Sequence, residues 1–247
     1  MGQRSAPRPA MCSRYFLDAD GNIIAFTFQV PVHDRIRKRY NIAPSQEAPV
    51  VRATEGGARE LAMLRWGLVP FWAKDPSVAS RMINARSETV MEKPAFRQAF
   101  RSRRCAIPAS GFYEWTGDPK HRIPHAITVE GRPLVAFAGL WECWKDAAGK
   151  PLETFTILTT SANRFVSGMH DRMPAILADG DIDAWLTGGI EDAWKVIRPY
   201  PEESMRERVV SRALNNPRNE SPDVWEMRSD AGEKLSTQMN AEKDERR

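Results

Sequence analysis

Prolines and glycines divide this chain of 247 residues into short segments, because it contains 18 Pro and 15 Gly. Proline has no backbone N–H to donate and breaks helix interiors, and glycine costs backbone entropy inside regular elements. We therefore expect many short strands and tight loops rather than long helices. Hydrophobic residues make up 42% of the chain, which is enough to build a core. No linker or repeat divides the sequence, so it predicts a single α+β domain dominated by strands.

Local patterns predict where several of these elements lie. Apolar runs rich in β-branched and aromatic residues predict strands, and apolar residues at helical spacing predict short helices. The expected strands are Asn22–Val30, Ala62–Val69, Glu153–Thr160 and Glu207–Leu214, with a hairpin made of His125–Glu130 and Pro133–Leu140. The expected helices are Pro94–Phe100 and Asp181–Leu186, the second opened by an aspartate cap and stopped by two glycines.

The two ends of the chain differ in composition from its body. The first ten residues are basic and rich in proline, and the segment after Trp225 is charged and poor in apolar residues. We expect residues 1–11 to be an extension that is removed or never translated, residues 12–226 to fold, and residues 227–247 to be a disordered tail.

Charge and cysteine usage narrow the function. The net charge of +4 is too small to attract nucleic acid by itself, so any DNA affinity must come from a local cleft. The three cysteines show no metal-binding or redox spacing, which predicts a reducing compartment, no metal and no cofactor. Without a secretion signal or a membrane-length apolar run, we expect a cytoplasmic monomer, associated with the nucleoid when it binds DNA.

Cys12 is the cysteine with the most distinctive context. An internal cysteine is usually a small buried apolar residue. Cys12, however, follows Met11, so translation from Met11 and removal of that methionine would make it the first residue. Its α-amine and thiol, with pKa values of about 8 and about 8.5, would then both be reactive near neutral pH. Such a 1,2-aminothiol condenses with an aldehyde to an imine and then to a thiazolidine ring.

Each of the other polar motifs can be interpreted as purely structural or as functional. Asn84 and Arg86 could belong to a simple polar turn, and Glu114 could be a solvated strand residue or, if buried, a general acid or base. The sequence around His170 and Arg172 could be a turn before a proline. The aromatic segment at residues 65–72 could be core, or an exposed platform on which bases stack.

Taken together, nine ordered segments resemble the SOS-response-associated peptidase (SRAP) family over roughly residues 11–220. They read MCSRY, RYNIAPSQ, RWGLVPFWAKD, INARSETV, RRCAIPASGFYEW, FAGLWE, TILTTSAN, MHDRMP and VVSRALNN. This resemblance implies an α+β fold with a β-barrel-like pair of antiparallel sheets flanked by short helices. It also implies a groove for single-stranded DNA and covalent capture of abasic sites, which protects the lesion during the DNA damage response.

The resemblance implies roles for individual residues. Cys12 takes the place of the reactive N-terminal cysteine, Asn84 positions its amine and thiol, Glu114 moves protons and His170 assists opening of the sugar. Two arginines resemble phosphate-gripping residues, and further residues resemble the wall or floor of the DNA groove. The expected DNA-binding set is Arg14, Asn41, Pro44, Trp66, Pro70, Phe71, Trp72, Arg86, Thr159 and Arg172.

Two departures from the family pattern bear on activity. Ser13 stands where the family commonly has glycine. The segment Met1–Met11 would block the Cys12 amine, so either translation starts at Met11, or the chain cleaves itself before Cys12, or it captures nothing. Two rival functions also remain open: a thiol peptidase that acts on other proteins, and a single-strand binder without catalysis.

Overall fold

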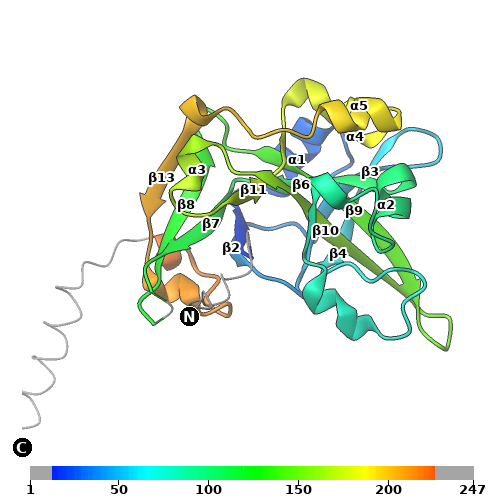
Figure 1. Ribbon diagram of the computed structural model, residues 1–247, viewed down its shortest axis with the longest axis horizontal. Helices are drawn as coiled ribbons and strands as arrows, with labels where there is room; N and C mark the ends of the chain where they lie inside the picture. Colours follow the sequence, from blue (N-terminus) through cyan, green and yellow to red (C-terminus); the bar gives the residue numbers. More distant parts are fainter. Residues whose placement is uncertain (1–12, 119, 226–247) are drawn as a thin grey trace, which may run out of the picture.

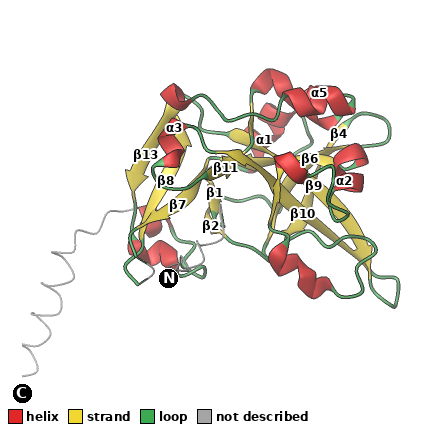
Figure 2. Cartoon of the chain, viewed as in Figure 1, coloured by secondary structure: helices red, strands yellow, loops and turns green. Residues whose placement is uncertain are grey.

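The computed structural model describes residues 13–118 and 120–225. The expected extension, Cys12 and the charged tail lie outside the described residues. Within them, short strands are the main elements, and the helices are all short and lie at the edges of the sheets (Figures 1 and 2). The strands are β1 (Tyr15–Leu17), β2 (Arg39–Ile42), β3 (Glu47–Ala53), β4 (Arg59–Trp66), β5 (Asn84–Arg86), β6 (Arg104–Ala109), β7 (Gly111–Thr116), β8 (Ile123–Val129), β9 (Val135–Lys145), β10 (Pro151–Ser161), β11 (Arg172–Pro174), β12 (Ile176–Leu177) and β13 (Met205–Val209). The α-helices are α1 (Gly21–Phe28), α2 (Arg97–Ser102), α3 (Arg164–Ser167), α4 (Ile182–Leu186) and α5 (Ile190–Lys195).

The strands form two sheets. The first has the order β13-β8-β7-β1-β2 and is antiparallel throughout. In the second, β10, β4, β3, β6 and β9 close on themselves because β10 pairs with both β4 and β9, which makes a five-stranded barrel. The strands β5, β11 and β12 extend its rim. This confirms the expected α+β class and barrel, except that β10 pairs in parallel with β4 and β5.

Close strand contact in the barrel depends on one glycine. All six residues of β6 are buried, and β9 packs directly across it with Gly139 opposite Cys105. A Cβ added to Gly139 would lie 2.2 Å from Cδ1 of Ile107 and 2.8 Å from the carbonyl oxygen of Thr156. Only glycine at this position lets these strands approach so closely, so Gly139 has a structural role in the barrel.

The first sheet separates two apolar cores. Tyr15 and Leu17 point into the main core that fills the barrel and the space between the sheets, and Phe16 points into a second, smaller core on the opposite face. The second core is covered by the segment 210–225, which we call the C-terminal strap. Neighbouring residues on β1 and β7 therefore point to opposite faces of the sheet. Only side chains on the same face can meet at a site.

The expected strand Asn22–Val30 is wrong, because this segment forms α1. Asp20 caps the helix by accepting hydrogen bonds from the backbone N–H groups of Asn22 (2.9 Å) and Ile23 (3.0 Å). Ile24 and Phe28, one turn apart, are the residues that reach the core. The apolar residues of this run therefore fit both the spacing of a strand and that of a helix. The cap and the burial of the apolar face in the core favour the helix.

The expected hairpin is also wrong. Its two halves become β8 and β9, which belong to different sheets: β8 pairs with β7 and β13, and β9 pairs with β6, β10 and β12. Only one bridge, between Val129 and Arg132, joins the chain across the turn. Pro133 has no backbone N–H with which to continue the hydrogen bonding between the two segments. The long apolar strand β9 pairs instead with strands of the second sheet.

The remaining expectations hold with shifted ends. The helix predicted over Pro94–Phe100 begins only at Arg97, and Pro94 lies in the preceding turn. Asp181 stands at the N-cap of α4, but its side chain makes no cap bond and instead accepts from Arg198 at 2.7 Å. The last predicted strand ends at Val209 and gives way to a 3-10 helix over Arg212–Asn215.

Candidate functional site

Two short strands flank the carboxyl end of β10 and bring together residues that are far apart in the sequence. On one side β5 runs parallel to β10, with Asn84 opposite Ile157 and Arg86 opposite Thr159. On the other side β11 runs antiparallel, and Thr159 also lies opposite Pro174 there. The end of β10 therefore joins the Asn84–Arg86 segment to the segment that follows His170.

Arg86 and Thr159 lie side by side in this register but are not equally accessible. Arg86 is exposed, and its side chain makes no hydrogen bond or ion pair within residues 13–118 and 120–225. Thr159 is fully buried, and its hydroxyl donates to the carbonyl oxygen of Ala85 at 3.3 Å. Arg86 is therefore available to an anionic ligand, whereas Thr159 is buried against the neighbouring strand and its expected contact with DNA stays a prediction.

Arg172 is engaged inside the protein. Its Nη1 and Nη2 donate to the two carboxylate oxygens of Glu88 at 2.5 and 2.7 Å, and Nη2 also donates to the carbonyl oxygen of Thr159 at 2.6 Å. The Arg172 side chain is only 11% exposed. This bidentate ion pair holds the pKa of Glu88 below its usual value. A phosphate would compete with the Glu88 carboxylate for Arg172, and the expected phosphate contact of Arg172 stays a prediction.

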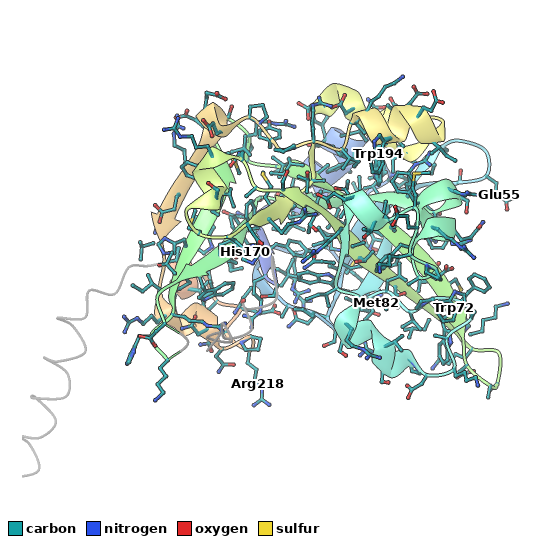
Figure 3. All side chains as sticks on the ribbon, viewed as in Figure 1. Glu55, Trp72, Met82, His170, Trp194 and Arg218 are labelled. Carbon is teal, nitrogen blue, oxygen red and sulfur yellow. The ribbon has the colours of Figure 1, made fainter. Side chains whose placement is uncertain are left out.

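His170 lies just before β11, and Figure 3 shows its position next to that strand. Its Nδ1 lies 3.0 Å from the backbone nitrogen of Arg172 and 3.0 Å from Oδ1 of Asp171. In the neutral ring Nδ1 accepts the proton of the Arg172 N–H, which places the ring proton on Nε2. In the protonated ring Nδ1–H can instead donate to Asp171.

Glu114 is a buried carboxylic acid on β7. It is 4% exposed, and its side chain lies on the same face as Phe112, which packs in the main core. Its opposite neighbour on β8 is His125, whose ring is held between Glu207 (2.5 Å) and Thr116 (2.7 Å). Burial of Glu114 fits the functional reading of this residue rather than that of a solvated strand residue.

The described chain enters the fold beside Glu114. The backbone N–H of Tyr113 donates to the carbonyl oxygen of Arg14 at 3.1 Å, and Tyr15 pairs with Phe112. Ser13 and Arg14 thus run along β7. Cys12, the expected reactive residue, lies outside the described residues.

Arg14 and Asn41 point to the opposite face of the first sheet. Nη1 of Arg14 donates to Oδ1 of Asn41 (3.0 Å) and to the carbonyl oxygen of Leu214 (3.1 Å). Nδ2 of Asn41 faces three carbonyl oxygens of the C-terminal strap, and Asn41 is 0% exposed. Nδ2 of Asn41 thus holds the strap and Oδ1 holds Arg14, and its expected contact with DNA stays a prediction. Pro44 remains accessible and lines a surface pocket together with Arg14 and Arg218.

The aromatic segment at residues 66–72 divides between core and surface. Trp66 is 0% exposed, stacks on Phe155 and donates from Nε1 to the carbonyl oxygen of Ile83 at 2.8 Å. Pro70 is also buried, so neither it nor Trp66 exposes a stacking surface in this structure, and their expected contacts with DNA stay predictions. Phe71 and Trp72 are 56% and 54% exposed, and Figure 3 shows Trp72 at the rim of the molecule.

The loop that carries Phe71 and Trp72 is held by β9 and β10. The backbone N–H of Val69 donates to the hydroxyl of Thr154 at 2.9 Å, and Nε1 of Trp144 donates to the carbonyl oxygen of Ala73 at 2.7 Å. A buried carboxylate, Glu142, accepts from Nη2 of Arg103 at 2.8 Å. Burial raises its pKa, and the Arg103 charge opposes this rise. These anchors keep two exposed aromatic rings in a fixed place.

Sequence reasoning missed Glu88, Glu142 and His125. Glu88 stands two residues after Arg86, but nothing in the sequence indicates that its partner is 84 residues away. Within the described part of the chain, no group of three His, Cys, Asp or Glu residues could hold a metal ion, and no helix is long and apolar enough to cross a membrane.

Comparison with known proteins identifies the family. A model of the family described as SOS response associated peptidase (SRAP) matches residues 11–217, and the chain belongs to this family. Abasic site processing protein YoqW of Bacillus subtilis is 41% identical over 223 residues, which cover 87% of this chain and 99% of that protein. Abasic site processing protein HMCES of Xenopus tropicalis is 32% identical and covers 77% of this chain and 66% of its own length.

Solved structures agree with the fold. A protein from Bacteroides thetaiotaomicron superposes with a TM-score of 0.79 at 25% identity, covering 87% of this chain and 99% of its own. A protein from Bordetella bronchiseptica gives a TM-score of 0.71 at 28% identity, with coverages of 81% and 100%.

Proposed function

We propose that this protein captures abasic sites in single-stranded DNA as a covalent crosslink through Cys12. Family membership and the names of the relatives support abasic-site processing. The observation that carries the proposal is that the chain at Arg14 bonds the backbone of Tyr113 on β7, next to buried Glu114 on the same strand. Cys12 is two residues before Arg14 in the sequence, and we assign Glu114 as its proton-transfer partner.

The chemistry needs no external oxidant or cofactor. The ring-opened abasic sugar presents an aldehyde, and the Cys12 amine adds to its carbon to form a carbinolamine. Loss of one water gives the imine, and addition of the thiol sulfur to the imine carbon returns a proton to nitrogen and closes a thiazolidine. One water leaves overall. Because amine and thiol belong to one residue, the second addition is intramolecular and fast.

The described residues divide the remaining work. His170, with its ring proton on Nε2 in the neutral state, is assigned the protonation of the sugar oxygen during ring opening. Glu114 is assigned the proton transfers that expel water, and Asn84 the orientation of the Cys12 amine and thiol. Exposed Arg86 is assigned a backbone phosphate.

The exposed rings of the 66–72 segment complete the DNA site. Phe71 and Trp72 are assigned base stacking, since each base offers a π face to an exposed ring regardless of sequence. The pocket beside Pro44 and Arg14 is assigned to an adjoining part of the strand.

The active species is assigned to the chain that begins at Cys12. The family match starts at Met11 and leaves residues 1–10 outside, which supports either a start at Met11 or self-cleavage before Cys12. Self-cleavage would be the peptidase activity named by the family. Mass spectrometry of protein purified from its own cells tests the assignment, and a mature chain that still carries residues 2–11 contradicts it.

The test is a denaturing gel of protein produced from Met11, incubated with a single-stranded oligonucleotide that contains one abasic site. Cys12→Ala removes the thiol, and Cys143→Ala is the matched control because that cysteine is half-buried on β9. We expect a heat-stable band for wild type and Cys143→Ala only, with a mass equal to both components less one water.

The rival functions give different results when the same proteins are also run on a native gel with abasic and intact DNA and incubated with unrelated proteins. If Cys12→Ala and wild type shift abasic and intact DNA equally and only under native conditions, the protein is a passive binder. If wild type forms no crosslink and instead degrades unrelated proteins, it is a general thiol peptidase. Either outcome contradicts the proposal.

A further inference from the structure

Three polar side chains are hydrogen-bonded to one another across the outer strands of the first sheet. The strands β7, β8 and β13 are neighbours there, and β13 is the edge strand (Figure 1). Oγ1 of Thr116 on β7 lies 2.7 Å from Nε2 of His125 on β8, and Nδ1 of the same ring lies 2.5 Å from Oε1 of Glu207 on β13. A hydroxyl, an imidazole and a carboxylate thus follow one another in that order. We call these three residues the relay.

The register of the strands places the relay on one face of the sheet. His125 lies opposite Glu114 on β7 and opposite Val209 on β13. Thr116 and Glu207 are each two residues away from these partners, so they are the diagonal neighbours of His125. Side chains two residues apart in a strand share a face, and diagonal neighbours are within reach of long side chains. Backbone pairing on both sides of β8 therefore holds the ring between its two partners.

The carboxylate determines where the ring proton of His125 lies. An ionised carboxylate only accepts hydrogen bonds, so Nδ1 donates its proton to Glu207. In the neutral ring Nε2 then carries a lone pair and accepts the proton of the Thr116 hydroxyl. A base that bonds a hydroxyl, and is itself oriented by a third group, is the arrangement that activates a hydroxyl as a nucleophile.

The relay lies where the sheet passes from the core to the surface. Glu114, on the same face, is 4% exposed, whereas Thr116, two residues nearer the turn to β8, is partly exposed. The side chains of His125 and Glu207 are 13% and 33% exposed. The imidazole is therefore shielded from most water, which strengthens its hydrogen bonds, while a small substrate can approach Thr116 from solvent.

We propose that the relay is a second catalytic centre, which transfers the acyl group of small carboxylic esters first to the Thr116 hydroxyl and then to water. This activity goes beyond the proposed capture of abasic sites. It does not involve Cys12, and it needs neither a metal nor a cofactor.

The reaction balances in two steps. Oγ1 of Thr116 attacks the carbonyl carbon of the ester, and its proton passes to Nε2 of His125. The bond from that carbon to the alcohol oxygen breaks, and the alcohol leaves with the proton, so that an acyl-threonine remains. Water then attacks the acyl carbon and gives a proton to Nε2, and the Thr116 oxygen takes this proton back as the carboxylic acid leaves. Glu207 stabilises the imidazolium formed in each step.

The test measures hydrolysis of p-nitrophenyl acetate by the full chain. Accessible thiols also react with this ester, so every protein carries Cys12→Ala and Cys143→Ala, and we call this pair of changes the background. Cys105 is retained because it is buried. Activity that survives in the background is independent of the proposed capture chemistry, so its presence or loss is unaffected by whether the protein crosslinks DNA.

Three variants of the relay are compared in the background: Thr116→Val, Thr116→Ser and His125→Gln. His121→Gln is the matched control, because His121 also pairs with a carboxylate, that of Asp118 at 3.0 Å, in the exposed turn before β8. Thermal unfolding of each protein establishes that it is folded.

We expect steady turnover in the background protein and a fall of about 100-fold or more for Thr116→Val and His125→Gln, the lower end of what a positioned base contributes. Thr116→Ser keeps a hydroxyl beside the ring and should retain activity, and His121→Gln should match the background protein. Peptide mass spectrometry after an acid quench should find the acetyl group on Thr116, a readout that does not depend on how well the variants fold.

Two results would overturn the proposal. The first is a background protein that hydrolyses the ester no faster than buffer. The second is equal turnover in the background protein and in folded Thr116→Val, with acetyl groups on other residues but not on Thr116. In either case the hydrogen bonds of the relay only hold β7, β8 and β13 together.

Discussion

Removal of the Asn41 side chain should destabilise the fold rather than weaken DNA binding. Asn41 is fully buried, and its Nδ2 lies 3.2, 3.0 and 2.9 Å from the carbonyl oxygens of Leu214, Asn216 and Asn219. Its Oδ1 accepts from Arg14 at 3.0 Å. Asn41→Ala leaves these groups buried without their partner, and this is the usual origin of a large mutational loss.

The size of the effect follows from the bonds. The two Nδ2 protons serve two of the three carbonyls at a time, and Oδ1 adds a third bond. At about 1 kcal/mol of net stability for each bond, Asn41→Ala should lower the free energy of unfolding by about 3 kcal/mol. For a domain of this size, about 2–4 °C per kcal/mol corresponds to a fall in Tm of about 6–12 °C.

The assay is thermal and urea unfolding, with Asn215→Ala as the control. Asn215 lies in the same strap but is exposed, and it bonds only Nε1 of Trp115 (2.7 Å) and the carbonyl oxygen of Arg122 (3.3 Å). We expect its replacement to cost less than about 1 kcal/mol. Asn41→Asp keeps the acceptor for Arg14 but turns an oxygen toward the strap carbonyls, so it should be at least as damaging as Asn41→Ala.

Two results would refute this reasoning. The first is a Tm of Asn41→Ala within about 2 °C of wild type, a shift expected for less than about 1 kcal/mol. The second is a normal Tm together with a large loss of affinity for single-stranded DNA. That result would return Asn41 to the DNA groove.

Three further predictions concern the rest of the molecule. Trp72→Ala should weaken binding of intact single-stranded DNA in a titration by about 1–3 kcal/mol, whereas Trp194→Ala, which removes another exposed tryptophan, should not; equal losses would contradict the stacking role. The ion pair of Glu88 should stabilise the fold above about pH 4.5 and lose this effect as pH falls through its lowered pKa, so Glu88→Gln and wild type should differ in Tm at pH 7 and converge in acid; a constant difference would contradict the assignment. Burial raises the pKa of the Cys105 thiol strongly, so in native protein iodoacetamide should modify the half-buried Cys143 before Cys105, as peptide mass spectrometry would show; early modification of Cys105 would contradict its burial.

Local patterns in the sequence predicted some elements well and others poorly. The pattern of Glu153–Thr160 predicts only a strand, and β10 forms there. The pattern of Asn22–Val30 is compatible with a strand or a helix. The Asp20 cap, together with burial of Ile24 and Phe28, favours the helix. Pairing of β8 and β9 was mispredicted because their partners lie in strands from other parts of the chain.

The residue types of the candidate site were readable from the sequence, but their accessibility was not. Trp66 and Trp72 belong to one motif, yet one is fully buried and the other is 54% exposed. Whether a tryptophan stacks on a base depends on what packs over it, and Phe155, which covers Trp66, comes from a strand nearly ninety residues later.

The sequence by itself determined the family and the strand-rich class, because these follow from residue identity and order. Only the tertiary structure decided which polar side chains face a ligand. It commits Asn41 to the C-terminal strap and Arg172 to Glu88, and leaves Arg86 exposed. The physical reason is that a buried donor or acceptor must find a partner, and that partner is supplied by segments that only folding brings into contact.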